Sequence, residues 1–299
     1  MAVEQFTGIL AAVVTPFTAD ASAVDEAAIQ RQTDHILGNG VRGLVPGGST
    51  GEFTTLTNAE RRRAAEVYIE AVAGRGPVIV GTAALSTAET VELSKHANDA
   101  GADAVMLVPP FYDIPSWDEL LAHFAAVSDA IDIPIMYYNL PALTGTELTP
   151  DQFAELARKT RVTCFKDTGG DAVKFTTILQ NHADDIQAIN GYDTLSFYGL
   201  AAGAKASVWG AASVIPRLCA DLFEALAVRI DLEEGRAVWK KIYPICEFLE
   251  AHNYPGAIKA GLELIGNPAG PTRRPILPLA PEYVEQFRQI LTASGVELA

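Results

Sequence analysis

Cysteine is scarce in this chain of 299 residues and occurs only at positions 164, 219 and 246. Their number and spacing match neither a disulfide framework nor a zinc pattern, which favours a reducing cytoplasm as the location. Long apolar runs are missing too, because no stretch of about 18 apolar residues that could cross a membrane occurs. The amino-terminal sequence MAVEQFTGILAAVVTPF has no basic leader and is interpreted as a first strand, not a signal peptide.

Basic residues are few: 22 Lys and Arg face 37 Asp and Glu, which gives a net charge of −15. Nucleic-acid binding needs a basic surface, so nucleic acid is not expected as a partner. Solubility is the simplest role of this charge, and a pocket for an acidic substrate must supply its own hydrogen-bond donors. All five histidines fall in predicted helices. A metal site at the strand ends is therefore not expected, and neither is a bound cofactor.

What the chain does contain is a short apolar, β-rich run every 20–35 residues. There are eight such runs, at 8–14, 43–47, 77–83, 104–110, 134–139, 162–168, 186–191 and 204–213. Helical patterns lie between them, with starts indicated by Asn58, Ser86, Ser116 and Thr149. This alternation predicts an α/β fold, a (β/α)8 TIM barrel, with a doubly wound sheet as the alternative.

Beyond residue 215 the pattern is wholly helical. It is interpreted as the last barrel helix followed by a C-terminal helical appendage. The predicted domains are therefore a catalytic barrel over residues 1–230 and a helical region over residues 231–299.

Polar segments follow several of the predicted strands. They are GGSTGE (47–52), FYD (111–113), YYN (137–139), KDTGG (166–170) and NGYD (190–193). Because the chemistry of such barrels is found at the carboxyl ends of the strands, these segments are expected to meet at one mouth.

Lys166 stands at the end of an otherwise apolar strand, VTCFKD. A lysine shielded from water can be neutral, and a neutral amine attacks ketones. The resulting Schiff base accepts electrons from a neighbouring carbon, as C–C cleavage, condensation and elimination require. The alternative is a structural ion pair with Asp167.

Two further groups fit this chemistry. Tyr138 ends the preceding strand and could donate and retrieve a proton, while Tyr137 is expected to pack on the opposite face. The loop GGSTGE offers backbone N–H groups and the hydroxyls of Ser49 and Thr50 to a carboxylate or phosphate, or forms an ordinary turn. It lacks the lysine of a P-loop and the dinucleotide fingerprint, so nucleotide binding is not expected.

The segments GGSTGE, YYNLPALTG, FKDTGGD and NGYD, in this order, resemble the class I pyruvate-dependent lyases of the dihydrodipicolinate synthase and N-acetylneuraminate lyase superfamily. The resemblance implies that Lys166 forms the imine with pyruvate or another 2-oxo acid and that Tyr138 transfers the proton. It implies that Ser49 and Thr50 hold the pyruvate carboxylate and that Gly191 and Val208 line the pyruvate pocket. Gly48 is a further expected substrate-binding residue. Tyr112 would enter the relay of a neighbouring subunit in a homotetramer built as a dimer of dimers.

The aldehyde half of the substrate is less defined. Leu143 stands where dihydrodipicolinate synthases usually carry an arginine. YNLPALTG is closer to the neuraminate lyases, but Thr194 and Gly210 replace a glutamate and a serine of those enzymes. Leu143, Phe111 and Trp209 suggest a less polar aldehyde side, with barrel packing as the alternative for Trp209.

The sequence therefore favours an aldolase or dehydratase acting on a 2-oxo acid, such as a 2-keto-3-deoxy sugar acid or an aryl-substituted 2-oxo acid. Thr168 and Asp193 would contact its hydroxyls. One alternative is a 4-hydroxy-tetrahydrodipicolinate synthase condensing pyruvate with aspartate semialdehyde. N-acetylneuraminate lyase and a non-catalytic sensor of 2-oxo acids are the others.

Overall fold

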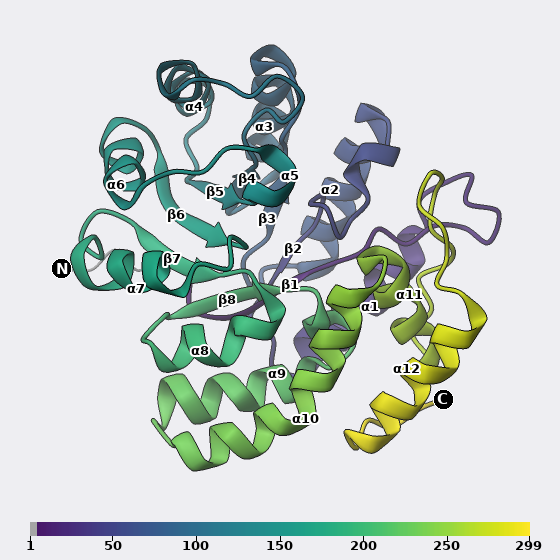
Figure 1. Cartoon of the computed structure of the whole chain (residues 1–299). Coiled ribbons are helices and arrows are strands. Elements are labelled where there is room, and N and C mark those ends of the chain that lie inside the picture. Colours follow the sequence, from purple (N-terminus) through teal and green to yellow (C-terminus); the bar gives the residue numbers. More distant parts are fainter. Residues whose placement is uncertain (1–4) are drawn as a thin grey trace.

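The computed structural model describes residues 5–299, and its strands form one parallel sheet in the order β2-β1-β8-β7-β6-β5-β4-β3 (Figure 1). The two ends of this sheet meet. A parallel bridge joins Leu44 to Val78, and the Leu44 N–H donates to the carbonyl of Pro77 at 3.0 Å. The sheet is thus a nearly closed (β/α)8 barrel, which confirms the predicted fold. The doubly wound alternative is wrong.

All eight predicted strands are present, each within its predicted run. They are β1 (Gly8–Ala12), β2 (Gly43–Val45), β3 (Ile79–Gly81), β4 (Ala104–Leu107), β5 (Ile135–Asn139), β6 (Val162–Asp167), β7 (Gln187–Asn190) and β8 (Ala206–Trp209). Most are shorter at the carboxyl end than the apolar run predicts, because the last residues of the run turn into the loops at the mouth.

The helices follow the strands in alternation. In the barrel they are α1 (Glu26–Gly38), α2 (Asn58–Val72), α3 (Thr87–Ala100), α4 (Trp117–Ala130), α5 (Pro141–Thr144), α6 (Pro150–Lys159), α7 (Ala172–Asn181), α8 (Ser196–Ala201) and α9 (Pro216–Phe223). The C-terminal helices are α10 (Leu232–Ala251), α11 (Tyr254–Leu264) and α12 (Pro281–Ala293).

The helix starts agree with the sequence except at α2. Ser86, Ser116 and Thr149 are N-caps, as predicted. The N-cap of α2 is Thr57 instead of Asn58, because Thr57 forms a reciprocal capping box with Glu60.

Side chains of each strand alternate between two apolar layers. Tyr137 and Phe165 point outward, where they are fully buried among the barrel helices, as expected for Tyr137. Met136, Tyr138 and Cys164 belong to the smaller cluster inside the barrel. Lys166 follows Cys164 by two residues and therefore points inward as well.

Trp209 is fully buried in the outer layer and does not line the site cavity described below. The packing interpretation of Trp209 is therefore right, and its suggested place on the aldehyde side is wrong.

The C-terminal helices lie on one side of the barrel, with α10 packed against α9 (Figure 1). Two side chains of α11 connect this region to the barrel mouth. The hydroxyl of Tyr254 accepts the Gly210 N–H at 3.0 Å, and the Lys259 ammonium lies 2.7 Å from the Glu52 carboxylate. The predicted domain boundary falls at Asp231, the N-cap of α10, and the division into two domains remains a prediction. Within residues 5–299, no helix is long and apolar enough to cross a bilayer.

Candidate active site

Lys166 lies inside the barrel near the end of β6, and only 5% of its surface is exposed. Its stem passes over Gly191, where an added Cβ would lie 2.4 Å from Lys166 Cγ and 2.6 Å from Cε. Both distances are shorter than carbon atoms can approach without a shift. Gly191 therefore leaves the space through which Lys166 reaches the mouth.

Tyr138 pairs with Lys166 in the register of β5 and β6. The Lys166 Nζ lies 4.1 Å from the centroid of the Tyr138 ring, close enough for a favourable contact between the amine and the ring face. The two side chains thus meet across adjacent strand ends, as the sequence predicts.

Asp167 points away from the interior, in agreement with strand alternation. Its Oδ1 accepts hydrogen bonds from Asn139 Nδ2 at 2.6 Å and from the Gly169 N–H at 3.0 Å. Burial raises the pKa of this carboxyl group, and these two bonds oppose the rise. The Asp167 carboxylate is thus bonded to a residue of β5 and to the loop after β6. The interpretation of Lys166 as the ion-pair partner of Asp167 therefore has no support.

The loop that carries Ser49 and Thr50 is fixed from two sides. Thr15 Oγ1 donates to the carbonyl of Gly51 at 2.7 Å. Glu52, 1% exposed, pairs with Lys259 and also accepts the Arg273 N–H at 2.9 Å. The hydroxyl loop is thus held by buried contacts to the segment after β1 and to the C-terminal region.

One cavity of about 370 Å³ brings most of the predicted site together, a size typical of small-molecule sites. The predicted residues in its lining are Ser49, Thr50, Tyr138, Leu143, Lys166, Thr168, Gly191, Asp193 and Gly210. Thr168 Oγ1 donates to the Gly191 carbonyl at 2.9 Å, which fixes the rotamer of Thr168 beside the lysine.

Four predicted site residues do not line this cavity. Val208 is fully buried in the apolar interior of the barrel, and Gly48 packs near Met106. Tyr112 is 84% exposed, outside the cavity of its own chain. Thr194 turns its N–H and hydroxyl to the carboxylate of Glu250, at 3.0 and 2.8 Å.

Asp193 is deeply buried in the part of the lining formed by the loop after β7 and by α10 and α11, which we call the far wall. Its Oδ2 accepts a hydrogen bond from the Tyr254 hydroxyl at 2.5 Å and another from the Ala211 N–H at 3.1 Å. Burial raises the pKa of Asp193 to about 6, although these hydrogen bonds oppose the rise. The Asp193 carboxylate therefore already has partners within the protein before any substrate hydroxyl approaches.

Sequence reasoning missed Glu250 and Tyr254, which line the cavity from α10 and α11. The segment FLEAHNYP gives no local sign of this role, because it reads as an ordinary amphipathic helix and its end. Only the packing of the C-terminal region brings these residues to the mouth.

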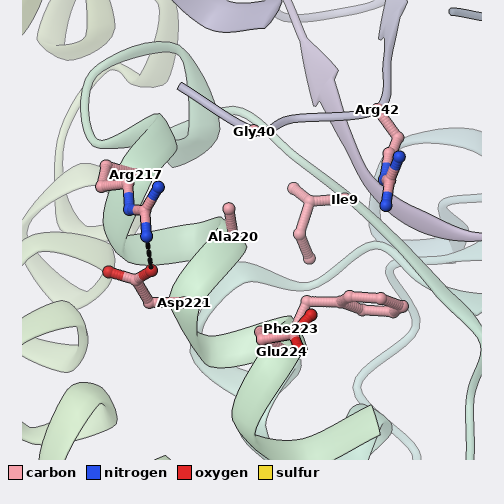
Figure 2. A pocket seen from close by; sticks show the side chains of 8 residues that line it. All are labelled: Ile9, Gly40, Arg42, Arg217, Ala220, Asp221, Phe223 and Glu224. Carbon is pink, nitrogen blue, oxygen red and sulfur yellow. Dashed lines mark ion pairs between the residues drawn. The ribbon is translucent and has the colours of Figure 1, made fainter. Parts of the chain in front are cut away.

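Figure 2 shows the residues that line a second cavity, of about 260 Å³. Ile9 and Arg42, near the amino ends of β1 and β2, line it together with residues of α9, including the ion pair between Arg217 and Asp221 at 2.9 Å. It shares no residue with the site around Lys166. Within residues 5–299, no three His, Cys, Asp or Glu side chains are grouped so that they could hold a metal ion.

The barrel, with a buried lysine and a tyrosine at its mouth, defines the class: an enzyme of the class I aldolase type, a pyruvate-dependent lyase. The chain belongs to the dihydrodipicolinate synthetase family, whose sequence model matches residues 5–294. It is 34% identical to a 4-hydroxy-tetrahydrodipicolinate synthase of Methanopyrus kandleri, over 98% of this chain and 97% of that protein.

Solved structures agree with this assignment. The chloride-inhibited dihydrodipicolinate synthase of Acinetobacter baumannii, in complex with pyruvate, superposes with a TM-score of 0.93 at 28% identity, covering 98% of this chain and 100% of that one. YagE of Escherichia coli K12, a member of the same family in complex with pyruvate, gives a TM-score of 0.93 at 30% identity, covering 98% and 99%.

Proposed function

We propose that this enzyme forms or breaks a bond in a 2-oxo acid, pyruvate in the first instance, through an imine at Lys166. The observation that carries the proposal is the contact between Lys166 Nζ and the Tyr138 ring, at 4.1 Å, in a cavity that also holds Ser49 and Thr50. Two related structures contain pyruvate, which supports the same first substrate here.

The imine explains why an amine is needed. The Lys166 nitrogen attacks the C2 carbonyl carbon, the carbonyl oxygen leaves as water, and a protonated imine remains. When C3 loses a proton or its bond to C4 breaks, the electron pair moves into the imine and gives an enamine. The enamine carbon can then attack an aldehyde, and hydrolysis returns the free lysine.

The neighbouring groups move the protons. The Tyr138 hydroxyl protonates the departing oxygen and later recovers the proton. Ser49 and Thr50 bind the carboxylate of the 2-oxo acid and relay the proton to solvent. Tyr112, which is outside the cavity of its own chain, would complete this relay in a neighbouring subunit of a homotetramer.

Two reactions are candidates for the second step, in which the aldehyde takes part. The relatives' names favour the condensation of pyruvate with aspartate semialdehyde, that is, 4-hydroxy-tetrahydrodipicolinate synthesis. The lining of the cavity favours a hydroxylated partner, as in the aldol reaction of a 2-keto-3-deoxy sugar acid. Its rim carries Leu143, and none of the described residues in its lining is an arginine.

The remaining alternatives have less support. For neuraminate cleavage, a serine at position 210 would be needed for the sugar, but an added Cβ there would lie 2.6 Å from the Tyr254 hydroxyl oxygen. A non-catalytic sensor does not fit an enzyme of the lyase class.

The test is reductive trapping. With pyruvate and borohydride, the wild-type chain should gain one covalent adduct at Lys166, detected by intact and peptide mass spectrometry, and Lys166→Ala should gain none. Lys205→Ala, at the opposite end of the barrel, is the matched control and should be labelled like wild type. Tyr138→Phe should fold normally and turn over at least about 100-fold more slowly. An adduct on Lys166→Ala, or full activity of Tyr138→Phe, would contradict the proposal.

A further inference from the structure

Glu250 brings a second carboxylate to the far wall of the cavity. It is the second-last residue of α10, and both of its oxygens accept hydrogen bonds from Thr194: Oε1 from the N–H and Oε2 from the hydroxyl. A carboxylate offers about four lone-pair sites. Thr194 uses two of them and the Asp193 N–H bonds to the same carboxylate, so about one acceptor site remains on a side chain that lines the cavity.

The charges around the cavity are unequal. Its lining contains the carboxylates of Asp193 and Glu250, and Lys166 is the one basic residue among the described lining residues. Once Lys166 holds a 2-oxo acid as a protonated imine, the carboxylate of that acid balances its charge. The aldehyde then meets a wall whose remaining charges are negative.

The surfaces next to this wall do not offset its charge. Leu140, Ala142 and Leu143 line the β5 side of the cavity, and Pro255 follows Tyr254 on the α11 side. An aldehyde with a carboxylate at its far end would be repelled by Glu250 and would find no cation to pair with. A hydroxyl there would instead donate to a carboxylate, a charge-assisted and therefore stronger hydrogen bond.

We infer that Glu250 determines the specificity for the aldehyde half: it accepts hydrogen bonds from an uncharged, hydroxylated aldehyde and excludes an aldehyde that ends in a carboxylate. The inference rests on the proposed imine chemistry and identifies the class of its second substrate.

A purely structural role for Glu250 is the competing explanation, since its bonds to Thr194 also tie α10 to the loop after β7. The two roles predict different measurements. A structural role changes stability or all rates together, whereas a specificity role changes the ratio between aldehydes.

The experiment uses the full chain in two stages. Borohydride trapping with pyruvate first establishes the imine. Then kcat/KM is measured with pyruvate and each of three aldehydes: D-glyceraldehyde, which is hydroxylated; propionaldehyde, which is apolar; and succinate semialdehyde, which is anionic. Aspartate semialdehyde is added as the substrate of the competing reaction. The variants are Glu250→Gln and, as matched control, Glu247→Gln, which is exposed one turn earlier on α10 and bonded to Tyr243.

Wild type and Glu247→Gln should prefer glyceraldehyde to both semialdehydes. Glu250→Gln should lower the ratio of glyceraldehyde to succinate semialdehyde efficiency by about tenfold, the effect of one charge-assisted hydrogen bond. The KM for pyruvate and the yield of the trapped adduct should not change, because the proposed pyruvate-binding residues lie on β6 and on the loop after β2, whereas Glu250 is bonded to Thr194 on the loop after β7.

Three results would overturn the inference while leaving the imine proposal intact. In the first, trapping succeeds but wild type prefers a semialdehyde. In the second, Glu250→Gln folds and keeps the wild-type ratio, and in the third it lowers kcat/KM by the same factor for every aldehyde. If Glu250→Gln does not fold, Leu143→Arg replaces it. This cation at an exposed rim position should raise succinate semialdehyde efficiency about tenfold, and no rise would count against the inference. Absence of a trapped adduct in wild type would overturn the proposed function and this inference together.

Discussion

Gly191 shows how a residue without a side chain controls a reactive one. The Lys166 stem occupies the space where a Cβ at position 191 would stand. The same glycine donates its N–H to the Asp167 carbonyl at 2.8 Å, which places the end of β7 beside β6. Gly191 is therefore needed for the position of the amine, in addition to any backbone contact with the substrate.

Gly191→Ala should slow imine formation about 100-fold, because a displacement of about 1 Å in a reacting group can cost that much. The rate of borohydride-trapped adduct formation with pyruvate is the measurement. Gly38→Ala serves as control, since a Cβ at Gly38 would meet nothing within 4 Å. Equal trapping rates in Gly191→Ala and wild type would contradict this account of Lys166.

Asp193 should make stability depend on pH. Its pKa in the folded protein is about 6, above the ordinary value of 3.8, because the carboxyl group is buried. A raised pKa means that the folded state binds the proton more tightly. The contribution of Asp193 to the free energy of unfolding is therefore fully present below about pH 4 and is lost as the pH rises through about 6. The total loss is about 3 kcal/mol.

Asp193→Asn removes this titration and keeps an acceptor for Tyr254. Unfolding free energies are measured by urea titration at pH 4, 5, 6 and 7. As the pH rises, they should fall more steeply for wild type than for Asp193→Asn. Glu250, whose pKa burial also raises, titrates in both proteins, so the difference between the two curves reports Asp193. Parallel curves would show that Asp193 has an ordinary pKa.

At the scale of elements, α11 connects two parts of the mouth, the loops after β7 and β2. Its first residue, Tyr254, donates to Asp193 on the far wall, and five residues later Lys259 pairs with Glu52 beside the hydroxyl loop. Lys259 is 5% exposed, and its burial lowers its pKa to about 8 even though Glu52 favours the charged form. The C-terminal region is thus part of what shapes the site.

Lys259→Met should destabilise the fold by about 3–5 kcal/mol, because it leaves the Glu52 carboxylate buried without its cation. Adding Glu52→Gln to this variant should recover part of the loss. Urea or thermal unfolding measures both, with Lys240→Met, an exposed lysine of α10, as control. If Lys259→Met lowers the free energy of unfolding by less than about 1 kcal/mol, the ion pair does not hold α11 to the loop that carries Ser49 and Thr50.

At the scale of the whole molecule, exposed apolar side chains gather near the mouth. Tyr112 is 84% exposed, Ile114 61% and Leu143 68%. Gly145 and Ile114 are close enough that an added Cβ at Gly145 would lie 2.5 Å from Ile114 Cδ1, so the loops after β4 and β5 touch. Such a surface fits a subunit interface better than contact with water.

If the proposed homotetramer forms, sedimentation should give about four times the chain mass of 31.8 kDa. Tyr112→Phe should keep this assembly, because the ring remains, and should lower kcat, because the relay loses its hydroxyl. A monomer with full activity, or a Tyr112→Phe variant with wild-type kcat, would exclude the shared relay.

The sequence alone determined the barrel and the central pair of the site. Strand and helix patterns are local, and the barrel rule places strand ends together, so Lys166, Tyr138, Ser49 and Thr50 could be assigned to one mouth from their positions in the chain. Alternation along a strand also separated Tyr137 from Tyr138.

Only the tertiary structure determined which residues form the far wall of the cavity. Glu250 and Tyr254 lie 56 and 61 residues from their partners Thr194 and Asp193. Their helix segments have no local feature that marks a binding role, since any amphipathic helix buries one face and leaves its polar residues unassigned. How α10 and α11 pack on the barrel determines which polar groups face the substrate, and that packing depends on contacts between distant parts of the chain.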